Sequence, residues 1–181
     1  MTRGALAALA GTGLLAGCAG PALLRFEAAL AANDSATAAL EQWCATRGIA
    51  SPARISASVV DGGPGDPAGA RTLLGVGAGE RLGFRHVRLD CGGMVLSEAY
   101  NWYVPARLTA EMNATLATTR TPFGKVAAPL EFRRERLASA RGAKLGCPAG
   151  SVVSHQAMLR LPDGRGLALL VECYTRANVD R

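Results

Sequence analysis

Two charged residues attract notice because each lies among apolar neighbours. Arg85 belongs to the segment 82–90 (LGFRHVRLD), where alternation places it on a face whose other members are Gly, Val and Leu. Glu172 is the only acidic or basic residue of 167–175 (LALLVECYT), and both alternating faces of that segment are apolar. A buried charge requires a partner, and a guanidinium matches a carboxylate in bidentate geometry. The two residues therefore predict either one ion pair that braces a sheet or a site that holds a small ligand between them.

Other polar and aromatic residues are weaker candidates. The run 101–103 (Asn-Trp-Tyr) could line a ring-shaped ligand, although aromatic residues also fill ordinary cores. Ser151, Ser154 and His155 are close in sequence, but their spacing matches no catalytic triad and the chain has no GxSxG motif. The glycine-rich segment 61–69 matches neither common phosphate-binding pattern. We therefore expect no hydrolase site and no phosphate-binding loop.

The cysteines and histidines do not have the spacing of a metal centre. The two histidines have no partner at ligand spacing, and no CxxC motif occurs, so we expect no metal. The cysteines beyond the N-terminal region are Cys44, Cys91, Cys147 and Cys173. In an exported protein they allow two disulfides in three possible pairings. We expect structural bridges or buried thiols, and we favour the pairing of Cys91 with Cys147.

Residues 1–17 have the pattern of a bacterial lipoprotein signal. A short basic start precedes the apolar stretch 4–16, which is too short to cross a membrane as a permanent helix. Leu15-Ala16-Gly17-Cys18 resembles a lipobox, so we expect a lipid on Cys18; a buried Ala-rich helix is the alternative. The pattern predicts a protein anchored in the cell envelope, and Ala19 favours the outer membrane. Without use of the signal, the protein would be cytoplasmic.

The rest of the composition is that of one globular domain. The chain has 181 residues, 49% of them hydrophobic, which suits a single core better than two. The formal charge of +6 is spread thinly apart from Arg133, Arg134 and Arg136 in the run FRRER. That run predicts a solvated strand face, because a nucleic-acid surface needs more cations and interleaved aromatics. We expect no nucleic-acid partner.

Periodicity and turn residues outline the elements that would position Arg85 and Glu172. Alternation predicts strands over 54–60, 82–90, 94–104, 130–138, 152–161 and 167–175. Helical spacing predicts helices over 19–33, 36–46 and 110–117. Short turns favour antiparallel pairing, so we expect an α+β fold: an antiparallel sheet of about six strands with helices packed on one side. The expected organisation is a signal (1–17), an anchor-proximal helical segment (18–33) and one domain (34–181).

Five segments, in order, resemble the chorismate lyase (chorismate–pyruvate lyase) family. They are 34–41 (DSATAALE), 84–89 (FRHVRL), 96–105 (LSEAYNWYVP), 121–125 (TPFGK) and the hairpin 159–172. Their common order over nearly all of the chain after residue 33 carries the resemblance. It implies a six-stranded antiparallel sheet with an enclosed pocket. It also implies conversion of chorismate to pyruvate and 4-hydroxybenzoate, a precursor for ubiquinone biosynthesis, without metal or cofactor.

The resemblance also implies roles for particular residues. Arg85 would bind the ring carboxylate of the ligand, assisted by backbone amides at Phe123 and Gly124. Glu172 would lie at the opposite end, beside the oxygen that becomes the phenol. The backbone around Ala36 would form part of a lid over the bound molecule.

Three functions are open at this point. The first is a chorismate lyase-like enzyme in which Arg85 and Glu172 are the essential pair. The second is a non-catalytic lipoprotein that binds a small aromatic carboxylate; Asn101 stands where the resemblance leads us to expect a second arginine, which removes a cation from the pocket. The third is a structural envelope lipoprotein whose pocket is filled by its own side chains. In each case we expect a monomer.

Overall fold

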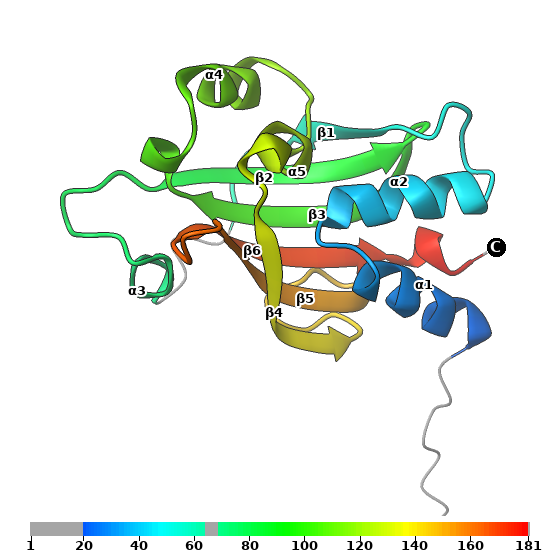
Figure 1. Cartoon of the computed structure of the whole chain (residues 1–181). Helices are drawn as coiled ribbons and strands as arrows, with labels where there is room; N and C mark the ends of the chain where they lie inside the picture. The colour runs from blue at the N-terminus through cyan, green and yellow to red at the C-terminus, as the bar shows by residue number, and fades with distance from the viewer. Residues whose placement is uncertain (1–19, 64–68, 181) are drawn as a thin grey trace, which may run out of the picture.

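One antiparallel sheet organises residues 20–63 and 69–180, the part of the chain that the computed structural model describes (Figure 1). Its strands are β1 (Ile55–Val59), β2 (Gly83–Cys91), β3 (Met94–Tyr103), β4 (Arg133–Arg141), β5 (Ser151–Arg160) and β6 (Gly166–Thr175). They lie in the order β1-β2-β3-β6-β5-β4, and each neighbouring pair is antiparallel. The expected α+β fold with its antiparallel sheet is confirmed.

The sheet consists of two consecutive three-stranded halves. β1, β2 and β3 form the first half, β4, β5 and β6 form the second half, and the two halves meet where β3 pairs with β6. The last strand is therefore central. All of its residues except the final one are buried, as its two apolar faces predicted.

Helices cover mainly one face of the sheet. α1 (Pro21–Ala31), α2 (Ala36–Thr46) and α5 (Phe123–Ala127) lie over this face, which we call the helix-covered face (Figure 1). α4 (Ala110–Thr118) packs beside α5, and the short α3 (Ala70–Leu74) packs on the opposite face against β6. The 3-10 helices are η1 (Pro105–Arg107), η2 (Ala128–Leu130) and η3 (Arg176–Asn178).

The main core lies between α1, α2 and the sheet. Phe26 of α1 is fully buried, and its ring centre lies 5.2 Å from that of Trp43 and 5.3 Å from that of Tyr174. Aromatic rings at such separations pack favourably as tilted or edge-on pairs. α1 therefore belongs to the same core as the region 34–181, rather than forming a segment apart from it.

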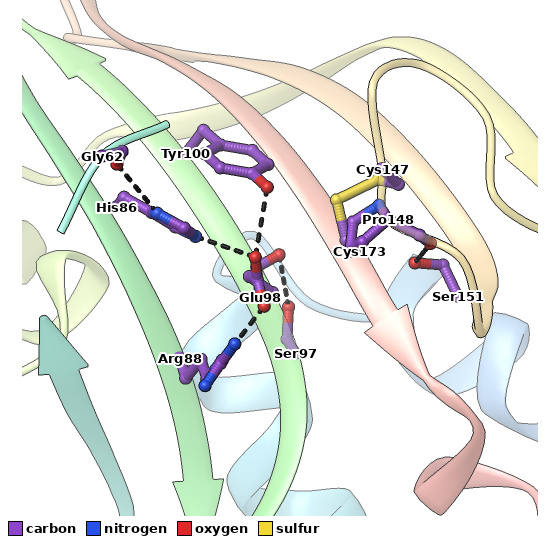
Figure 2. Close-up of polar contacts among 10 residues, drawn as sticks. All are labelled: Gly62, His86, Arg88, Ser97, Glu98, Tyr100, Cys147, Pro148, Ser151 and Cys173. Carbon is purple, nitrogen blue, oxygen red and sulfur yellow. Dashed lines mark hydrogen bonds and ion pairs between the residues drawn. A yellow bond between two sulfur atoms is a disulfide. The ribbon is translucent and has the colours of Figure 1, made fainter. Parts of the chain in front are cut away.

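Two disulfides join described residues, and neither is the pairing that the sequence favoured. Cys44 of α2 is bonded to Cys91 at the end of β2. Cys147 is bonded to Cys173 of β6, as Figure 2 shows. The expected Cys91–Cys147 bridge is wrong because the two residues lie on opposite faces of the sheet. Cys91 belongs to the core beneath α1 and α2, whereas Cys147 packs against the cluster on the other face.

A polar cluster occupies part of the opposite face (Figure 2). Glu98 accepts hydrogen bonds from His86 Nε2 (2.8 Å), from the Tyr100 hydroxyl (3.1 Å) and, in addition, from Arg88 Nε (3.1 Å). His86 Nδ1 lies 2.9 Å from the carbonyl oxygen of Gly62, which ties the chain after β1 to the sheet. Burial alone would raise the pKa of Glu98, but these hydrogen bonds hold it below its ordinary value. The polar groups of this cluster are bonded to one another.

The membrane-related expectations fall mostly outside the described residues. Within 20–63 and 69–180, no helix has the length and apolar character needed to cross a membrane. The expected signal 1–17 and the expected lipid attachment at Cys18 lie outside the part of the chain that the structure describes.

Candidate ligand-binding site

A cavity lies between the helix-covered face of the sheet and the N-terminal ends of α2 and α5. About 490 Å³ of space there is not occupied by protein atoms, the solvent at its open mouth included. Its lining residues are Ser35, Ala36, Thr37, Val87, Leu89, Ser97, Ala99, Asn101, Pro122, Phe123, Gly124, Phe132, Arg134, Leu159, Leu170 and Glu172. The structure therefore brings together five of the six candidate residues that the sequence singled out for ligand contact, all except Arg85.

The roof of the cavity depends on a close approach of α5 to α2. Ser35 caps α2 by accepting a hydrogen bond from a backbone amide in its first turn (3.4 Å). A Cβ atom at Gly124 would lie only 2.7 Å from Ser35 Oγ and 3.0 Å from Thr37 Oγ1, so glycine permits the contact. Lys125 Nζ then pairs with Glu41 at 2.5 Å and links the two helices on the outside.

The floor of the cavity is an apolar stretch of sheet with polar groups at both ends. Val87, Ala99 and Glu172 are aligned across β2, β3 and β6, because Val87 pairs with Ala99 and Ala99 with Glu172. Two residues further along the same strands, Arg85 pairs with Asn101. Arg85, Asn101 and Glu172 therefore share the helix-covered face, since residues opposite one another in a sheet project from the same side.

Glu172 forms a buried ion pair with Arg134 of β4, at one end of the cavity. The Tyr174 hydroxyl donates to the same carboxylate oxygen, Oε2, at 3.1 Å. His155 Nδ1 lies 3.2 Å from Arg134 Nη2, which donates to it. The side chains of Arg134 and Glu172 are only 5% and 4% exposed, so each charge depends on the other for compensation.

Arg134 is a charged residue of the candidate site that the sequence analysis missed. The run FRRER predicted a solvated strand face, and for Arg134 this was wrong. In the register of the sheet Arg134 lies opposite Leu159, and both line the cavity. Alternation within the run held a usable signal, because Phe132 and Arg134 share one face of the strand and both side chains line the cavity.

The surroundings of this ion pair set the protonation states near it. Burial alone lowers the pKa of Arg134, but Glu172 and Tyr174 reverse this and raise it above its ordinary value. Burial and the nearby carboxylate raise the pKa of Tyr174 well above its ordinary value. Burial lowers the pKa of His155 to about 4, so the ring is neutral near pH 7 and can accept the hydrogen bond from Arg134.

Arg85 lies beyond the other end of the cavity. The residue is 7% exposed; Nη1 reaches the Thr121 carbonyl oxygen at 3.5 Å, and Nη2 has no hydrogen-bond partner among the described residues. Burial lowers the pKa of Arg85. Arg85 and Glu172 are two strands apart across the sheet and two residues apart along the strand direction. With standard sheet dimensions, their α-carbons are roughly 12 Å apart. Arg85 borders a second, more open depression together with Phe84 and Trp102.

The remaining chemical candidates do not form a site. Ser154 donates to the Gly142 carbonyl oxygen (2.6 Å), whereas His155 faces Arg134 from the next position of the strand, so the two side chains point to opposite faces. In the described ranges, no group of three or more His, Cys, Asp or Glu residues is placed to hold a metal ion.

The chain is similar to a bacterial protein whose activity is not described by its name. No family model matches the chain. Its sequence is 39% identical to the uncharacterized protein y4mC of Sinorhizobium fredii, in an alignment that covers 87% of this chain and 75% of that protein.

In structure, the chain is similar to bacterial transcriptional regulators. The TM-score to PhnF from Mycobacterium smegmatis is 0.55 at 13% identity, covering 80% of this chain and 65% of PhnF. The ligand-binding domain of a GntR-family regulator from Bordetella bronchiseptica gives 0.49 at 14% identity (68% of this chain, 83% of that one), and YydK from Bacillus subtilis gives 0.49 at 11% (70% and 60%). The chain spans less than two thirds of PhnF and of YydK. The likeness to PhnF shows the fold, a chorismate lyase-like antiparallel sheet with helices.

Proposed function

Because the chain belongs to the same family as the y4mC protein of Sinorhizobium fredii and has a chorismate lyase-like fold, we propose that it binds a small aromatic carboxylate. The site is the cavity beneath α2 and α5. One observation carries the proposal: a buried guanidinium with a free Nη2 lies beyond one end of an apolar floor, and a polar pair lies at the other.

Each part of the ligand has a matching part of the site. The ligand carboxylate accepts hydrogen bonds from Arg85. These bonds are strong because the Arg85 guanidinium is charged and buried. The ring lies on the apolar floor formed by Val87, Leu89 and Leu170. A hydroxyl at the far end donates to Glu172 Oε1, because Arg134 and Tyr174 both bond to Oε2.

Binding titrations test this proposal. We expect the purified full-length protein to bind 4-hydroxybenzoate, and Arg85→Gln to weaken binding roughly 10- to 100-fold, the range of a hydrogen bond to a charged group. Arg88→Gln is the matched control, because Arg88 lies on the same strand but on the opposite, exposed face. Isothermal titration calorimetry gives the dissociation constants. Absence of binding by benzoate and its hydroxy derivatives at millimolar concentration would falsify the proposal.

The lyase reaction is the second candidate function. It is supported by the arrangement of Ala36, Phe123, Gly124 and Glu172 around one cavity, which is the arrangement that the family resemblance implies. In that reaction Arg85 would orient the ring carboxylate, and Glu172 would lie beside the ether oxygen that leaves. Enclosure and orientation would supply most of the rate, since aromatisation drives the reaction.

Turnover separates this candidate from simple binding. Wild-type protein incubated with chorismate should release 4-hydroxybenzoate faster than the Arg85→Gln and Glu172→Gln variants, as followed by liquid chromatography. Equal rates in wild type and variants, matching the protein-free blank, would exclude the lyase while leaving the binding function in place.

A further inference from the structure

We infer that the cavity accepts a ligand with one negative charge and discriminates against a ligand with two. The inference deepens the proposed binding function and rests on it, because it specifies the charge class of the ligand in the same cavity. It follows from counting the charged side chains that face or border the cavity and finding which of them lack compensation.

The far end of the cavity carries no net charge. The Arg134 guanidinium and the Glu172 carboxylate form one buried ion pair, with both side chains at least 95% buried. Tyr174 is fully buried and protonated, and its hydroxyl group donates a hydrogen bond to Glu172. His155 accepts from Arg134 through Nδ1 and is neutral. A second anionic group placed here would face the Glu172 carboxylate, and the charge of the neighbouring cation, Arg134, is already compensated by that carboxylate.

A single positive charge, that of Arg85, lies beyond the near end of the cavity. The Arg85 guanidinium is buried, and its only hydrogen bond in the described ranges is the long one to the Thr121 carbonyl oxygen (3.5 Å). Asn101, directly opposite Arg85 in the sheet, is buried and neutral. One ligand carboxylate therefore compensates Arg85, and among the described residues that line the cavity no second cation lies at this end.

The charged side chains near α2 and α5, which form the roof of the cavity, do not change the net charge of the site. Glu41 and Lys125 neutralise each other at 2.5 Å, on the outer side of α2 and α5. Asp34 is exposed to solvent and does not line the cavity. The uncompensated charge of the site is therefore +1. A monoanion brings it to zero, whereas a dianion leaves a buried negative charge, which is strongly unfavourable.

A pair of ligands of equal shape tests the inference. 4-Carbamoylbenzoate and benzene-1,4-dicarboxylate differ in one amide group for one carboxylate, so they carry one and two negative charges at pH 7.5. We expect the wild-type protein to bind 4-carbamoylbenzoate about tenfold more tightly or better, because the second carboxylate would be buried without a partner. Isothermal titration calorimetry with both compounds gives the ratio of dissociation constants.

Charge variants identify the origin of the preference. Glu172→Gln raises the charge of the site to +2, so the preference for the monoanion should shrink or reverse. Glu135→Gln is the matched control, because Glu135 also faces an arginine, Arg160, but on the exposed edge of β4. Its ratio should equal that of the wild type. A shift in the ratio is a readout that a purely structural role of Glu172 would not produce.

The outcomes distinguish the inference from the proposed function. Equal or tighter binding of the dicarboxylate by wild-type protein overturns the inference and leaves the binding function standing, even if Glu172→Gln does not fold. An unchanged ratio in a folded Glu172→Gln variant also overturns it. If neither compound nor 4-hydroxybenzoate binds, the proposed function fails, and the inference with it. Chorismate has two carboxylates, so the inference favours binding over the lyase reaction.

Discussion

His155 lies under the Arg134–Glu172 pair, and its protonation should make the stability of the fold depend on pH. Its pKa is about 4 in the folded protein and about 6.5 in an unfolded chain. As the pH falls below 6.5, His155 becomes protonated in the unfolded chain, whereas in the folded protein it stays neutral until about pH 4. The contribution of His155 to the free energy of unfolding is therefore fully present above pH 6.5. It declines by about 3 kcal/mol in all as the pH falls towards 4.

Substitution of His155 by glutamine isolates this effect. The amide oxygen of Gln can still accept the hydrogen bond from Arg134, but the side chain does not titrate. Urea unfolding at several pH values between 7.5 and 4.5 should show a flatter pH dependence in His155→Gln than in the wild type. Identical slopes would mean that the charged groups around the ring, Arg134, Arg136, Glu27 and Glu172, balance differently from the arrangement described above.

At this scale, alternation along single strands predicted burial well and partners poorly. It placed Arg85 and Glu172 on buried faces, which is correct. It could not show that Glu172 pairs with Arg134, because that contact joins strands separated by β5 and depends on register across the sheet. A bulge between Arg136 and Ala138 adds to the difficulty, since it interrupts the alternation of β4.

The two disulfides hold different elements and should affect the cavity differently. Cys44–Cys91 fixes α2, whose N-terminal end forms part of the cavity roof, whereas Cys147–Cys173 fixes a loop on the opposite face. The bridges close 47 and 26 residues, for which chain entropy gives about 4 and about 3.5 kcal/mol of stabilisation.

Paired alanine variants test the difference. Loss of either disulfide should lower the free energy of unfolding by about 2–5 kcal/mol, measured with urea. Only the Cys44→Ala/Cys91→Ala variant should also weaken binding of 4-hydroxybenzoate, because the roof is then free to move away from the sheet. Weakened binding of the same size in the Cys147→Ala/Cys173→Ala variant would show that α2 has no special part in the site.

Elements with a clear period were predicted closely, and elements defined by tertiary contacts were not. The helix expected over 36–46 has those bounds in the structure, and five of the six strands begin and end within a residue of expectation. The strand expected over 130–138 lies at 133–141, and the five-residue α3 was not predicted. Neither the pairing of β3 with β6 nor the disulfide partners could be deduced, because the first depends on which strand edges meet and the second on which face of the sheet each cysteine occupies.

For the whole protein, we propose attachment to the cell envelope through a lipid on Cys18. Two disulfides within one small domain support it, since such bonds form and persist in oxidising compartments. Expressed with its own N-terminus in a Gram-negative host, the protein should fractionate with the outer membrane, and Cys18→Ala should release it from the membrane fraction.

The redox state of the same samples is an independent check. Thiol alkylation before and after reduction should detect four protected cysteines in the exported protein. Recovery of wild type and Cys18→Ala alike from the cytoplasm, with reduced thiols, would argue against the envelope location without bearing on the cavity.

The meeting of two halves at β3 and β6 has a consequence for engineering. Each half contains its own disulfide, Cys44–Cys91 in the first and Cys147–Cys173 in the second, and neither bond crosses the junction. The cavity does cross it, with Val87 and Ala99 on one side and Leu170 and Glu172 on the other. A chain cleaved near η1 would yield two internally stapled fragments whose reassembly the ligand should promote, which is the design of a split biosensor.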